Sequence, residues 1–387
     1  MSLKQKLRRM KWVYPALNWT RRTGGRLLMR LFHAIYGIDP KMALFSSYSG
    51  KGYTDNPRCV CEALHALRPD LRIVWQLRRG FSASDFPDYV QIIPAHSLKA
   101  LRAYATAGVF VDNMNRPQYM LKFPGQIYVQ TWHGDRGFKK ILFDMGTHET
   151  FPDGQQMDLA VSGSDFGSRV YRSAFGYSGE ILECGCPRND LLIENPPELA
   201  GQVRQALGIA AGTSVLMYAP TFRDASKGGK ISAALSLERV RRTLEKTTGR
   251  PWICLSRGHA LNHGVSSDAQ MDVSNYPNIS ELLLITDLLI SDYSSIAGDF
   301  MLLNRPAIFY QPDREAYVRE RALYFDPDES PLIVVHSEDE LIERLSRPID
   351  GAANCREVLR FFGACESGRA SQAVARRIDE LLSAPSR

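Results

Sequence analysis

The chain has few cysteines for its length, and their spacing excludes two common kinds of small fold. Seven cysteines occur among 387 residues, and the two closest pairs, Cys59/Cys61 and Cys184/Cys186, are C-x-C rather than C-x-x-C. A disulfide-stapled domain needs a far higher cysteine content, and a structural zinc site needs Cys/His spacing that is absent here. We therefore expect buried, reduced thiols in a cytoplasmic protein.

Long apolar runs and export signals are also missing. No stretch reaches about 18 uncharged apolar residues, so the sequence predicts no transmembrane helix. The apolar positions near the N-terminus are interrupted by Arg26 and Arg30, and no small-residue cleavage site follows them. This pattern excludes a secretory signal peptide. The sequence contains no internal repeat and no low-complexity segment.

Acidic residues are missing from residues 1–38, although they are common elsewhere. This segment holds nine Lys and Arg residues, so the rest of the chain has 48 − 9 = 39 basic against 42 acidic residues. The cations are interleaved with aromatic residues, and an apolar helical face follows: Trp12, Tyr14, Trp19, Leu27, Leu28, Leu31, Phe32 and Ile35. Such a basic amphipathic helix is typical of peripheral association with an anionic membrane. The alternative is a helix packed on the body with a solvated basic face. The acidic body argues against a nucleic-acid partner.

The remaining chain alternates short apolar runs with helical patterns, which is typical of parallel sheets covered by helices. Its length exceeds the roughly 250–300 residues at which a single core stops growing. We place a boundary in the ENPPEL stretch, Glu194–Leu199, which gives domains at 39–196 and 197–387 after the segment 1–38. We expect strands at Met42–Ser46, Arg72–Leu77, Tyr89–Ile93, Gly108–Val111, Ile127–Thr131, Asp158–Val161, Glu180–Cys184, Val215–Ala219, Trp252–Ser256, Leu288–Ser291, Ala307–Tyr310 and Ile333–Val335. The fold class is therefore α/β, with two Rossmann-like doubly wound domains facing a cleft.

Three polar clusters follow expected strands of the first domain. Ser46–Pro57 (SSYSGKGYTDNP) is either an ordinary loop or a substrate contact. Thr131–Lys140 (TWHGDRGFKK) presents His133 beside Gly134, which suits a general base near neutral pH, with Lys139 and Lys140 available to an anionic substrate. The alternative is a structural histidine. In CGCPRND, Arg188 either reaches a phosphate or belongs to a purely structural turn.

Three further clusters follow strands of the second domain. In YAPTFRD, Tyr218, Pro220, Thr221 and Arg223 form a candidate nucleotide-binding turn, in which Tyr218 or Phe222 would face a base. The alternative is an Arg223–Asp224 surface pair. In SRGH, Arg257 and His259 make a second anion-facing pair.

The stretch Ile285–Pro312 combines a buried strand, a hydroxyl-rich turn and a helix start. Asp292, Ser294 and Ser295 stand at the end of the strand, and Asp299 follows one helical turn later. Free amides and serine hydroxyls at such a point can bind a phosphate. The alternative is that the serines only cap the helix and Asp299 forms a salt bridge.

Taken in this order, the six clusters resemble the CDP-glycerol glycerophosphotransferase family of teichoic-acid and capsule synthesis. The family patterns are S-F-x-G-K-x-x-x-x-N-P, W-H-G-T-P-L-K-K, G-x-P-R-N-D, Y-A-P-T-W-R-D, R-x-H-P and T-D-Y-S-S-x-x-x-D-F. They correspond here to Ser47–Pro57, Trp132–Lys140, Gly185–Asp190, Tyr218–Asp224, Arg257–Ala260 and Ser291–Phe300. Three departures stand out: Asp135–Arg136–Gly137 in place of T-P-L, Ala260 in place of proline, and Ser291 in place of threonine.

The resemblance implies a GT-B-like fold with the nucleotide in the C-terminal domain and the acceptor in the N-terminal one. It maps catalytic histidines onto His133 and His259, and phosphate contacts onto Arg223, Ser294 and Ser295, with Asp299 nearby. We expect an acceptor hydroxyl to attack the phosphorus of CDP-glycerol with release of CMP. In this mechanism His133 is the base, and the second-domain groups neutralise the leaving phosphate. No D-x-D pair stands at a strand end, so we expect no obligatory metal and no other cofactor.

The size of the chain suggests a primase that adds one glycerol phosphate to an undecaprenyl-diphosphate-linked saccharide. The expected location is the cytoplasmic face of the cell membrane, with residues 1–38 as the peripheral contact. A glycerol- or ribitol-phosphate polymerase or a capsule enzyme of the same family remains an alternative. So do a sugar-nucleotide transferase or epimerase of the same architecture, and a non-catalytic nucleotide-sensing membrane protein.

Overall fold

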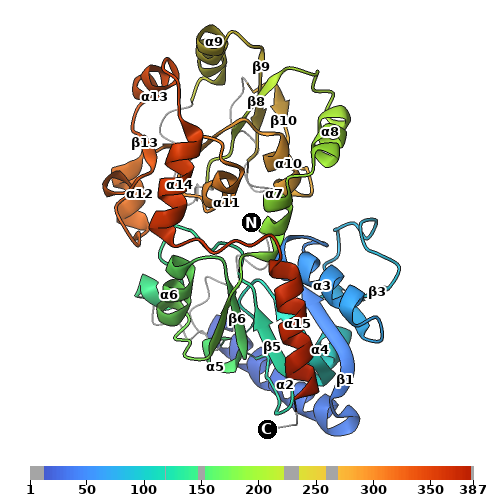
Figure 1. The fold of residues 1–387 in the computed structure, drawn as a ribbon. Helices are drawn as coiled ribbons and strands as arrows, with labels where there is room; N and C mark the ends of the chain where they lie inside the picture. Colours follow the sequence, from blue (N-terminus) through green and yellow to red (C-terminus); the bar gives the residue numbers. More distant parts are fainter. Residues whose placement is uncertain (1–12, 118, 147–152, 222–234, 259–268, 385–387) are drawn as a thin grey trace.

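The computed structural model describes residues 13–117, 119–146, 153–221, 235–258 and 269–384. Two parallel sheets follow one another along the chain, each with helices packed against it (Figure 1). This arrangement confirms the expected pair of Rossmann-like α/β domains.

The first sheet has seven strands in the order β3-β2-β1-β4-β5-β6-β7, and its neighbours pair in parallel. The strands are β1 (Asp39–Ser46), β2 (Arg72–Leu77), β3 (Val90–Pro94), β4 (Ala107–Asp112), β5 (Ile127–Gln130), β6 (Leu159–Ser162) and β7 (Glu180–Glu183). Every residue of β4 is buried, because helices cover both faces of a parallel sheet. The order reverses between β1 and β4, which places a switch point where ligands commonly bind.

The second sheet repeats this order with six parallel strands, β10-β9-β8-β11-β12-β13. The strands are β8 (Ser214–Tyr218), β9 (Trp252–Ser256), β10 (Met271–Asp272), β11 (Leu288–Ser291), β12 (Ala307–Tyr310) and β13 (Ile333–Val335). The sequence pattern missed β10, because two residues at a sheet edge are too short to show a period. The switch point here lies between β8 and β11.

The helices lie mostly between consecutive strands, and serine side chains begin several of them. They are α2 (Val13–Tyr36), α3 (Asp55–Leu67), α4 (Leu98–Thr106), α5 (Asp153–Gln156), α6 (Asp165–Ala174), α7 (Asp190–Glu194), α8 (Pro197–Ala206), α9 (Leu237–Thr248), α10 (Ile279–Ile285), α11 (Ile296–Phe300), α12 (Arg314–Glu320), α13 (Glu338–Leu345), α14 (Gly351–Phe362) and α15 (Ala370–Ser383). The Ser97 and Ser337 hydroxyls, for example, accept hydrogen bonds from the amides of Ala100 and Glu340 and so cap α4 and α13.

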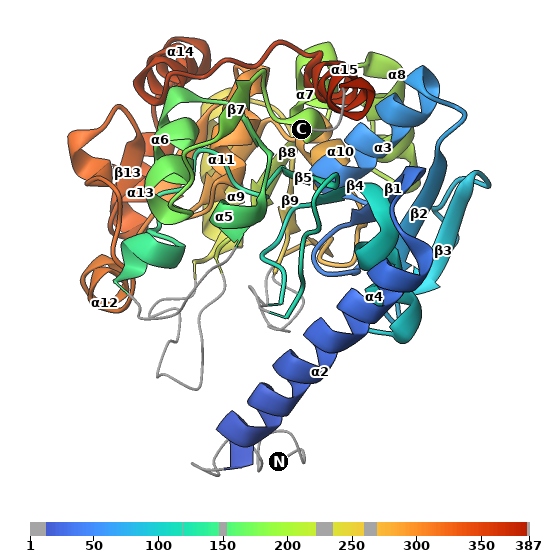
Figure 2. The ribbon, with the colours of Figure 1, turned by 90° about the horizontal axis from the view of Figure 1, so that it is seen from below.

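Helix α2 extends from the first domain with one face packed and another left uncovered (Figure 2). On the packed face, Met29 is fully buried and the His33 ring stacks on Phe123 at a centroid distance of 4.0 Å. Leu27, Leu31 and Ile35 lie on an exposed stripe at four-residue spacing. Among the described residues, no helix has the length and hydropathy needed to cross a membrane.

The last helix, α15, returns to the first domain (Figure 1). Val374, Ala375 and Ile378 belong to the same core cluster as Phe45 and Trp75 of the first sheet. The boundary predicted at Glu194–Leu199 puts all of residues 197–387 in the second domain. Helix α15 instead packs on the first sheet, whereas α14 packs in the core of the second domain through Cys355, Val358 and Phe362.

Candidate active site

The sequence-predicted base, His133, lies just beyond the carboxyl end of β5. One hydrogen bond fixes which of its ring nitrogens carries the hydrogen. Its Nδ1 lies 2.6 Å from the carbonyl oxygen of Asn113, the residue that follows β4. A carbonyl only accepts, so Nδ1 carries the hydrogen and Nε2 carries the lone pair. Burial lowers the pKa of His133 below its ordinary value, against the opposing effects of the Asn113 hydrogen bond and the Asp55 charge. The imidazole is therefore neutral near pH 7 and can accept a proton at Nε2.

The backbone around His133 is strained and held in place by polar side chains. Tyr48, Asp55 and Trp132 have φ values of +46°, +63° and +48°, which side chains of this size rarely adopt. The Asn56 side-chain amide donates to the carbonyl oxygens of Thr131 and Trp132 at 3.2 and 3.1 Å. The first polar cluster, Ser46–Pro57, therefore supports the His133 loop.

Sequence reasoning did not single out Asn113 as a site residue. Besides its bond to His133, its side-chain oxygen accepts the Tyr48 amide at 2.7 Å. The available signal was its position directly after a fully buried strand beside the switch point.

The His133 loop also meets the serine turn of the second domain. Gly134 approaches so closely that a Cβ atom there would lie 2.9 Å from Ser295 Oγ. Ser294 and Ser295 immediately precede α11, which has only five residues. The Ser294 hydroxyl accepts from the Ile296 amide at 3.4 Å, whereas Ser295 makes no capping hydrogen bond through its side chain. The structure thus brings together His133 and the hydroxyl turn, which the sequence placed in different domains.

Asp299, predicted to lie near substrate, stands at the centre of a buried charge network. Its carboxylate accepts hydrogen bonds from Arg136 NH2 at 2.9 Å and from Arg188 NH2 at 2.7 Å. Arg136 also pairs with Glu366 at 2.8 Å, and Arg188 pairs with Asp55 at 3.2 Å. The network therefore ties the first domain, α11 and the segment that leads to α15. In this structure Asp299 and Arg188 bind each other.

The network reaches the base through Asp55. Burial alone would raise the pKa of the Asp55 carboxyl, but the Arg188 charge and the Tyr48 hydroxyl outweigh burial and hold that pKa below its ordinary value. The Tyr48 hydroxyl donates to Asp55 Oδ2 at 2.6 Å, and its ring centroid lies 5.4 Å from that of His133. An ionised carboxylate is thus held close to the base.

Asp292 and Arg257, also predicted to bind substrate, make protein contacts at the carboxyl edge of the second sheet. The Asp292 carboxylate accepts from the Thr221 amide at 2.9 Å and from the Thr221 hydroxyl at 2.5 Å. Arg257 NH1 donates to the carbonyl oxygens of Val273 and Tyr276 at 3.0 and 2.9 Å. These bonds fix the turns that follow β8 and β9. The buried Tyr218 is the last residue of β8, and the half-buried Pro220 lies in the first of these turns.

The two lysines of the His133 cluster lie in a segment of the first domain that pairs with the second domain. The Lys140 amide donates to the Ala322 carbonyl at 2.8 Å, and Lys139 forms an antiparallel bridge with Leu323. Both residues are half-buried. His259 and Arg223, the remaining predicted site residues, lie outside the described residues. Within the part that is described, no group of three or more His, Cys, Asp or Glu side chains could hold a metal ion.

A comparison with known protein families matches residues 27–380 to the family described as CDP-Glycerol:Poly(glycerophosphate) glycerophosphotransferase. The chain belongs to this family. It is therefore an enzyme of the CDP-glycerol glycerophosphotransferase class, as its six motifs suggested.

Curated relatives of this family include both transferases and polymerases. The chain is 34% identical over 363 residues to a teichoic acid glycerol-phosphate transferase of Staphylococcus aureus, covering 86% of this chain and 92% of that protein. It is 32% identical over 391 residues to a teichoic acid poly(glycerol phosphate) polymerase of Bacillus spizizenii, covering 92% and 97% of the two chains. It spans only 44% of the polymerase of Bacillus subtilis, to which it is 31% identical over 330 residues and 80% of this chain.

Solved structures agree with the fold. The chain superimposes on the wall teichoic acid polymerase TagF, soaked with CDPG, with a TM-score of 0.78, 27% identity and coverage of 96% and 98% of the two chains. A UDP-N-acetylglucosamine 2-epimerase of Listeria monocytogenes, described as putative, matches with a TM-score of 0.54 at 10% identity over 89% of this chain and 98% of that one, which shows the fold alone. The GT-B-like architecture of this glycerophosphotransferase-family chain is thus confirmed.

The loop after His133 is longer than the motif it resembles. The pattern W-H-G-T-P-L-K-K has eight positions, whereas Trp132–Lys140 has nine residues. The departure at Asp135–Arg136–Gly137 therefore lies in a loop with one residue more than that pattern. Of the other departures, Ser291 keeps a hydroxyl, which donates to the Ala219 carbonyl at 2.7 Å.

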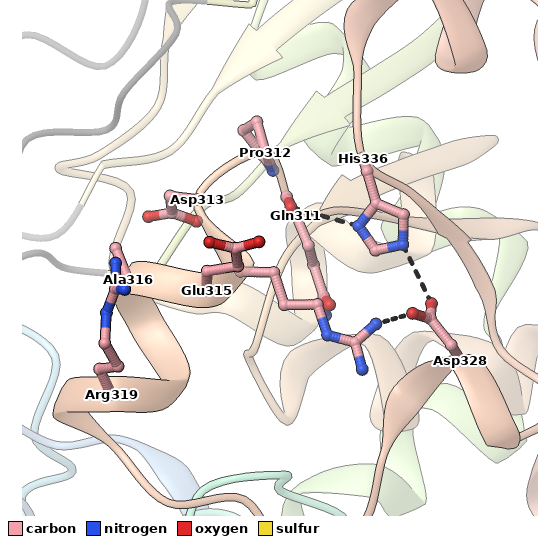
Figure 3. Close-up of a pocket in the computed structure, with 9 residues that line it drawn as sticks. Gln311, Pro312, Asp313, Glu315, Ala316, Arg319, Asp328 and His336 are labelled. Carbon is pink, nitrogen blue, oxygen red and sulfur yellow. Dashed lines mark hydrogen bonds and ion pairs between the residues drawn. The ribbon is translucent and has the colours of Figure 1, made fainter.

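A hollow of this glycerophosphotransferase-family chain lies at the ends of β12 and β13 (Figure 3). Gln311 follows β12, and its side-chain amide donates to the Asp292 carbonyl at 3.2 Å. His336 follows β13 and lies 3.1 Å from Asp328, which also pairs with Arg314. The hollow has charges of both signs, so it does not favour a simple anion.

Proposed function

We propose that the chain transfers glycerol phosphate from CDP-glycerol to a hydroxyl of an undecaprenyl-diphosphate-linked saccharide and releases CMP. The family supports the donor and the reaction type. The observation that supports a catalytic role in this chain is the geometry of His133. Its Nδ1–H is committed to the Asn113 carbonyl, and its Nε2 is basic beside a loop that touches Ser295.

The proposed reaction is an in-line displacement at the phosphorus that bears glycerol. His133 Nε2 accepts the proton of the acceptor hydroxyl as the new O–P bond forms, and the bond from that phosphorus to the CMP oxygen breaks. Ser294 and Ser295 would donate to phosphate oxygens, with His259 and Arg223 as further proposed partners. Fixed donors of this kind are commonly worth about 2.7–4 kcal/mol each in the transition state.

Chain length does not separate a primase from a polymerase. We propose a primase, in line with the glycerol-phosphate transferase of Staphylococcus aureus. A polymerase is a second candidate, because the Bacillus spizizenii polymerase is covered to 97% of its length by this chain. Both would use the same base and donor, and they differ in whether the product is accepted again.

One assay separates these candidates. Purified protein is incubated with CDP-glycerol and a lipid-linked disaccharide, CMP release is followed, and the product is sized by mass spectrometry. A single added glycerol phosphate is the expected product of a primase, whereas a ladder of products would show a polymerase. Turnover with CDP-ribitol but not with CDP-glycerol would identify CDP-ribitol as the donor. The absence of CMP release with either donor would contradict the proposed function.

We also propose that α2 contacts an anionic membrane, as the location of a lipid-linked acceptor requires. Its exposed apolar stripe of Leu27, Leu31 and Ile35 runs beside the exposed Arg26 and Arg30. Apolar side chains that enter the headgroup region, together with arginines facing anionic lipid, suit an interfacial helix. The same helix is anchored to the first domain by the buried Met29, so binding would orient the whole protein.

The triple variant Leu27→Ser, Leu31→Ser, Ile35→Ser is expected to lose most binding to vesicles that contain phosphatidylglycerol, as measured by sedimentation. The replaced side chains are 66%, 50% and 60% exposed, so the fold should be unaffected. A matched control, Leu67→Ser, removes an apolar side chain that is 41% exposed at the end of α3 and should bind as the wild type does. Equal binding by the triple variant would exclude this face of α2 as the membrane contact.

A further inference from the structure

The loop that carries His133 is fastened to the second domain by a residue that departs from the family pattern. Arg136 is fully buried and pairs with Asp299 at 2.9 Å and with Glu366 at 2.8 Å. Its Cβ also lies against α11, since a Cβ at Gly298 would be 2.9 Å from it. Proline, which the family pattern has here, could make neither ion pair.

Phe138, two residues further along the loop, makes a second attachment to the second domain. Phe138 is 1% exposed and belongs to the core cluster of the second domain. Its ring centroid lies 5.2 Å from those of both Phe309 and Phe325. Its carbonyl accepts the Tyr324 amide at 2.8 Å, which continues the pairing made by Lys140.

The residues just before Arg136 are attached to the first domain instead. His133 is bonded to Asn113, and the Asp135 carboxylate accepts from the Ser162 hydroxyl and the Gly163 amide, each at 3.0 Å. Arg136 itself contacts both domains, because its NH1 donates to the Gly163 carbonyl at 3.1 Å while its NH2 pairs with Asp299. Any rotation of the two domains would therefore have to deform the loop within three residues of the base.

We propose that Arg136, supported by Phe138, is a positioning residue that sets where His133 stands relative to the Ser294–Ser295 turn. This inference rests on the proposed function, in which His133 is the base. In-line transfer needs the attacking hydroxyl, the base and the phosphorus in fixed relation, and a displacement of 1 Å can cost about 10²-fold in rate. The anchored loop holds the two domains in one arrangement, so that the base and the donor turn stay assembled between turnovers.

The test compares Arg136→Met with Arg136→Lys and with Phe138→Ala. We expect kcat to fall at least about tenfold in Arg136→Met, while the Kd for CDP-glycerol, measured by calorimetry, changes less than about threefold. Arg136→Lys keeps the charge and should recover part of kcat. Small-angle X-ray scattering of Arg136→Met should show a larger radius of gyration than the wild type. The control Arg305→Met removes a half-buried arginine whose NH1 bonds Leu284 and Thr286 within the second domain, and should keep kcat.

Phe138→Ala keeps the test decisive if loss of a buried charge prevents Arg136→Met from folding. This variant leaves the ion pairs of Arg136 in place, and its kcat should also fall below that of the wild type. Suppose that the folded Arg136 and Phe138 variants keep the wild-type kcat and radius of gyration, while His133→Gln is inactive. This result would overturn the positioning role and leave the proposed function standing. An active His133→Gln would exclude His133 as the base and so remove the ground for the positioning role, whereas a wild-type protein that releases no CMP would overturn the proposed function. In either case the scattering comparison would decide whether Arg136 holds the domains together.

Discussion

Replacing His133 with glutamine is expected to lower the rate of CMP release by about 10²–10⁴-fold, the usual contribution of a positioned general base. Glutamine retains a polar side chain but cannot accept a proton at neutral pH. The Kd for CDP-glycerol should be almost unchanged, because the proposed donor contacts lie in the second domain. Stopped-flow or coupled assays of CMP release, with calorimetry for binding, would measure both quantities.

The same variant should change the pH dependence of the reaction. Burial lowers the pKa of His133 below its ordinary value, so the base stays neutral as the pH falls through the range where an exposed histidine, with a pKa of about 6.5, becomes charged. The acid limb of the wild-type profile should therefore lie below that value, and it should be absent in His133→Gln. A wild-type rate in the variant would exclude His133 as the base.

A second histidine, His65, provides a control that distinguishes loss of the catalytic base from a general effect of replacing a packed histidine. His65, near the end of α3, is half-buried and stacks on Tyr89 with a centroid distance of 3.6 Å. It has no place in the proposed mechanism. We expect His65→Gln to keep kcat and its pH profile, so that a loss specific to His133 reports the catalytic step.

Asp299→Asn is expected to lower the free energy of unfolding by about 3–5 kcal/mol, the usual cost of breaking a buried ion pair. The Asp299 carboxylate is 7% exposed and faces two guanidinium groups, those of Arg136 and Arg188. Asparagine keeps the shape but removes the negative charge and turns a donor toward one of the arginines. With total stabilities of about 5–15 kcal/mol for folded domains, this loss is large. Activity should fall as well, since the same carboxylate holds the His133 loop against α11.

Thermal melting would test this expectation, with a decrease in Tm of roughly 6–20 °C for a domain of this size. The control is Glu343→Gln, which breaks an exposed pair with Arg347 at 2.8 Å. Such i,i+4 pairs contribute about 0.3–0.5 kcal/mol, so the melting curve should hardly move. An unchanged Tm for Asp299→Asn would mean that the arginines find other partners and that the network is not a support of the fold.

The positions of the strands were predictable because buried parallel strands appear as short, nearly continuous apolar runs. The limits of β2, β9, β11 and β12 agree with the sequence prediction. The meeting of His133 with the serine turn also followed from topology, since both stand at carboxyl ends of strands near a switch point. The pattern could supply this much because the positions of strands, and of the residues at their ends, depend on local periodicity.

The use of the charged side chains could not be predicted in the same way. Arg136 lies 163 residues from Asp299 in the sequence, and Arg188 lies 111 residues from it. The residues that neighbour a motif arginine in the sequence do not indicate whether it binds a phosphate or a carboxylate of its own chain. The amphipathic pattern of Ala370–Ser383 is likewise typical of a helix, but it does not indicate the sheet against which that helix packs.

Helix α15 has a consequence for how the protein is made. The first core contains Val374, Ala375 and Ile378, which are synthesised after the whole second domain. Domains usually fold in the order in which they leave the ribosome, at about 5–20 residues per second. Here the second domain can complete its core first, while the apolar surface of the first sheet that α15 covers stays exposed until that helix has been synthesised. We therefore expect the nascent first domain to be prone to aggregation until α15 leaves the ribosome.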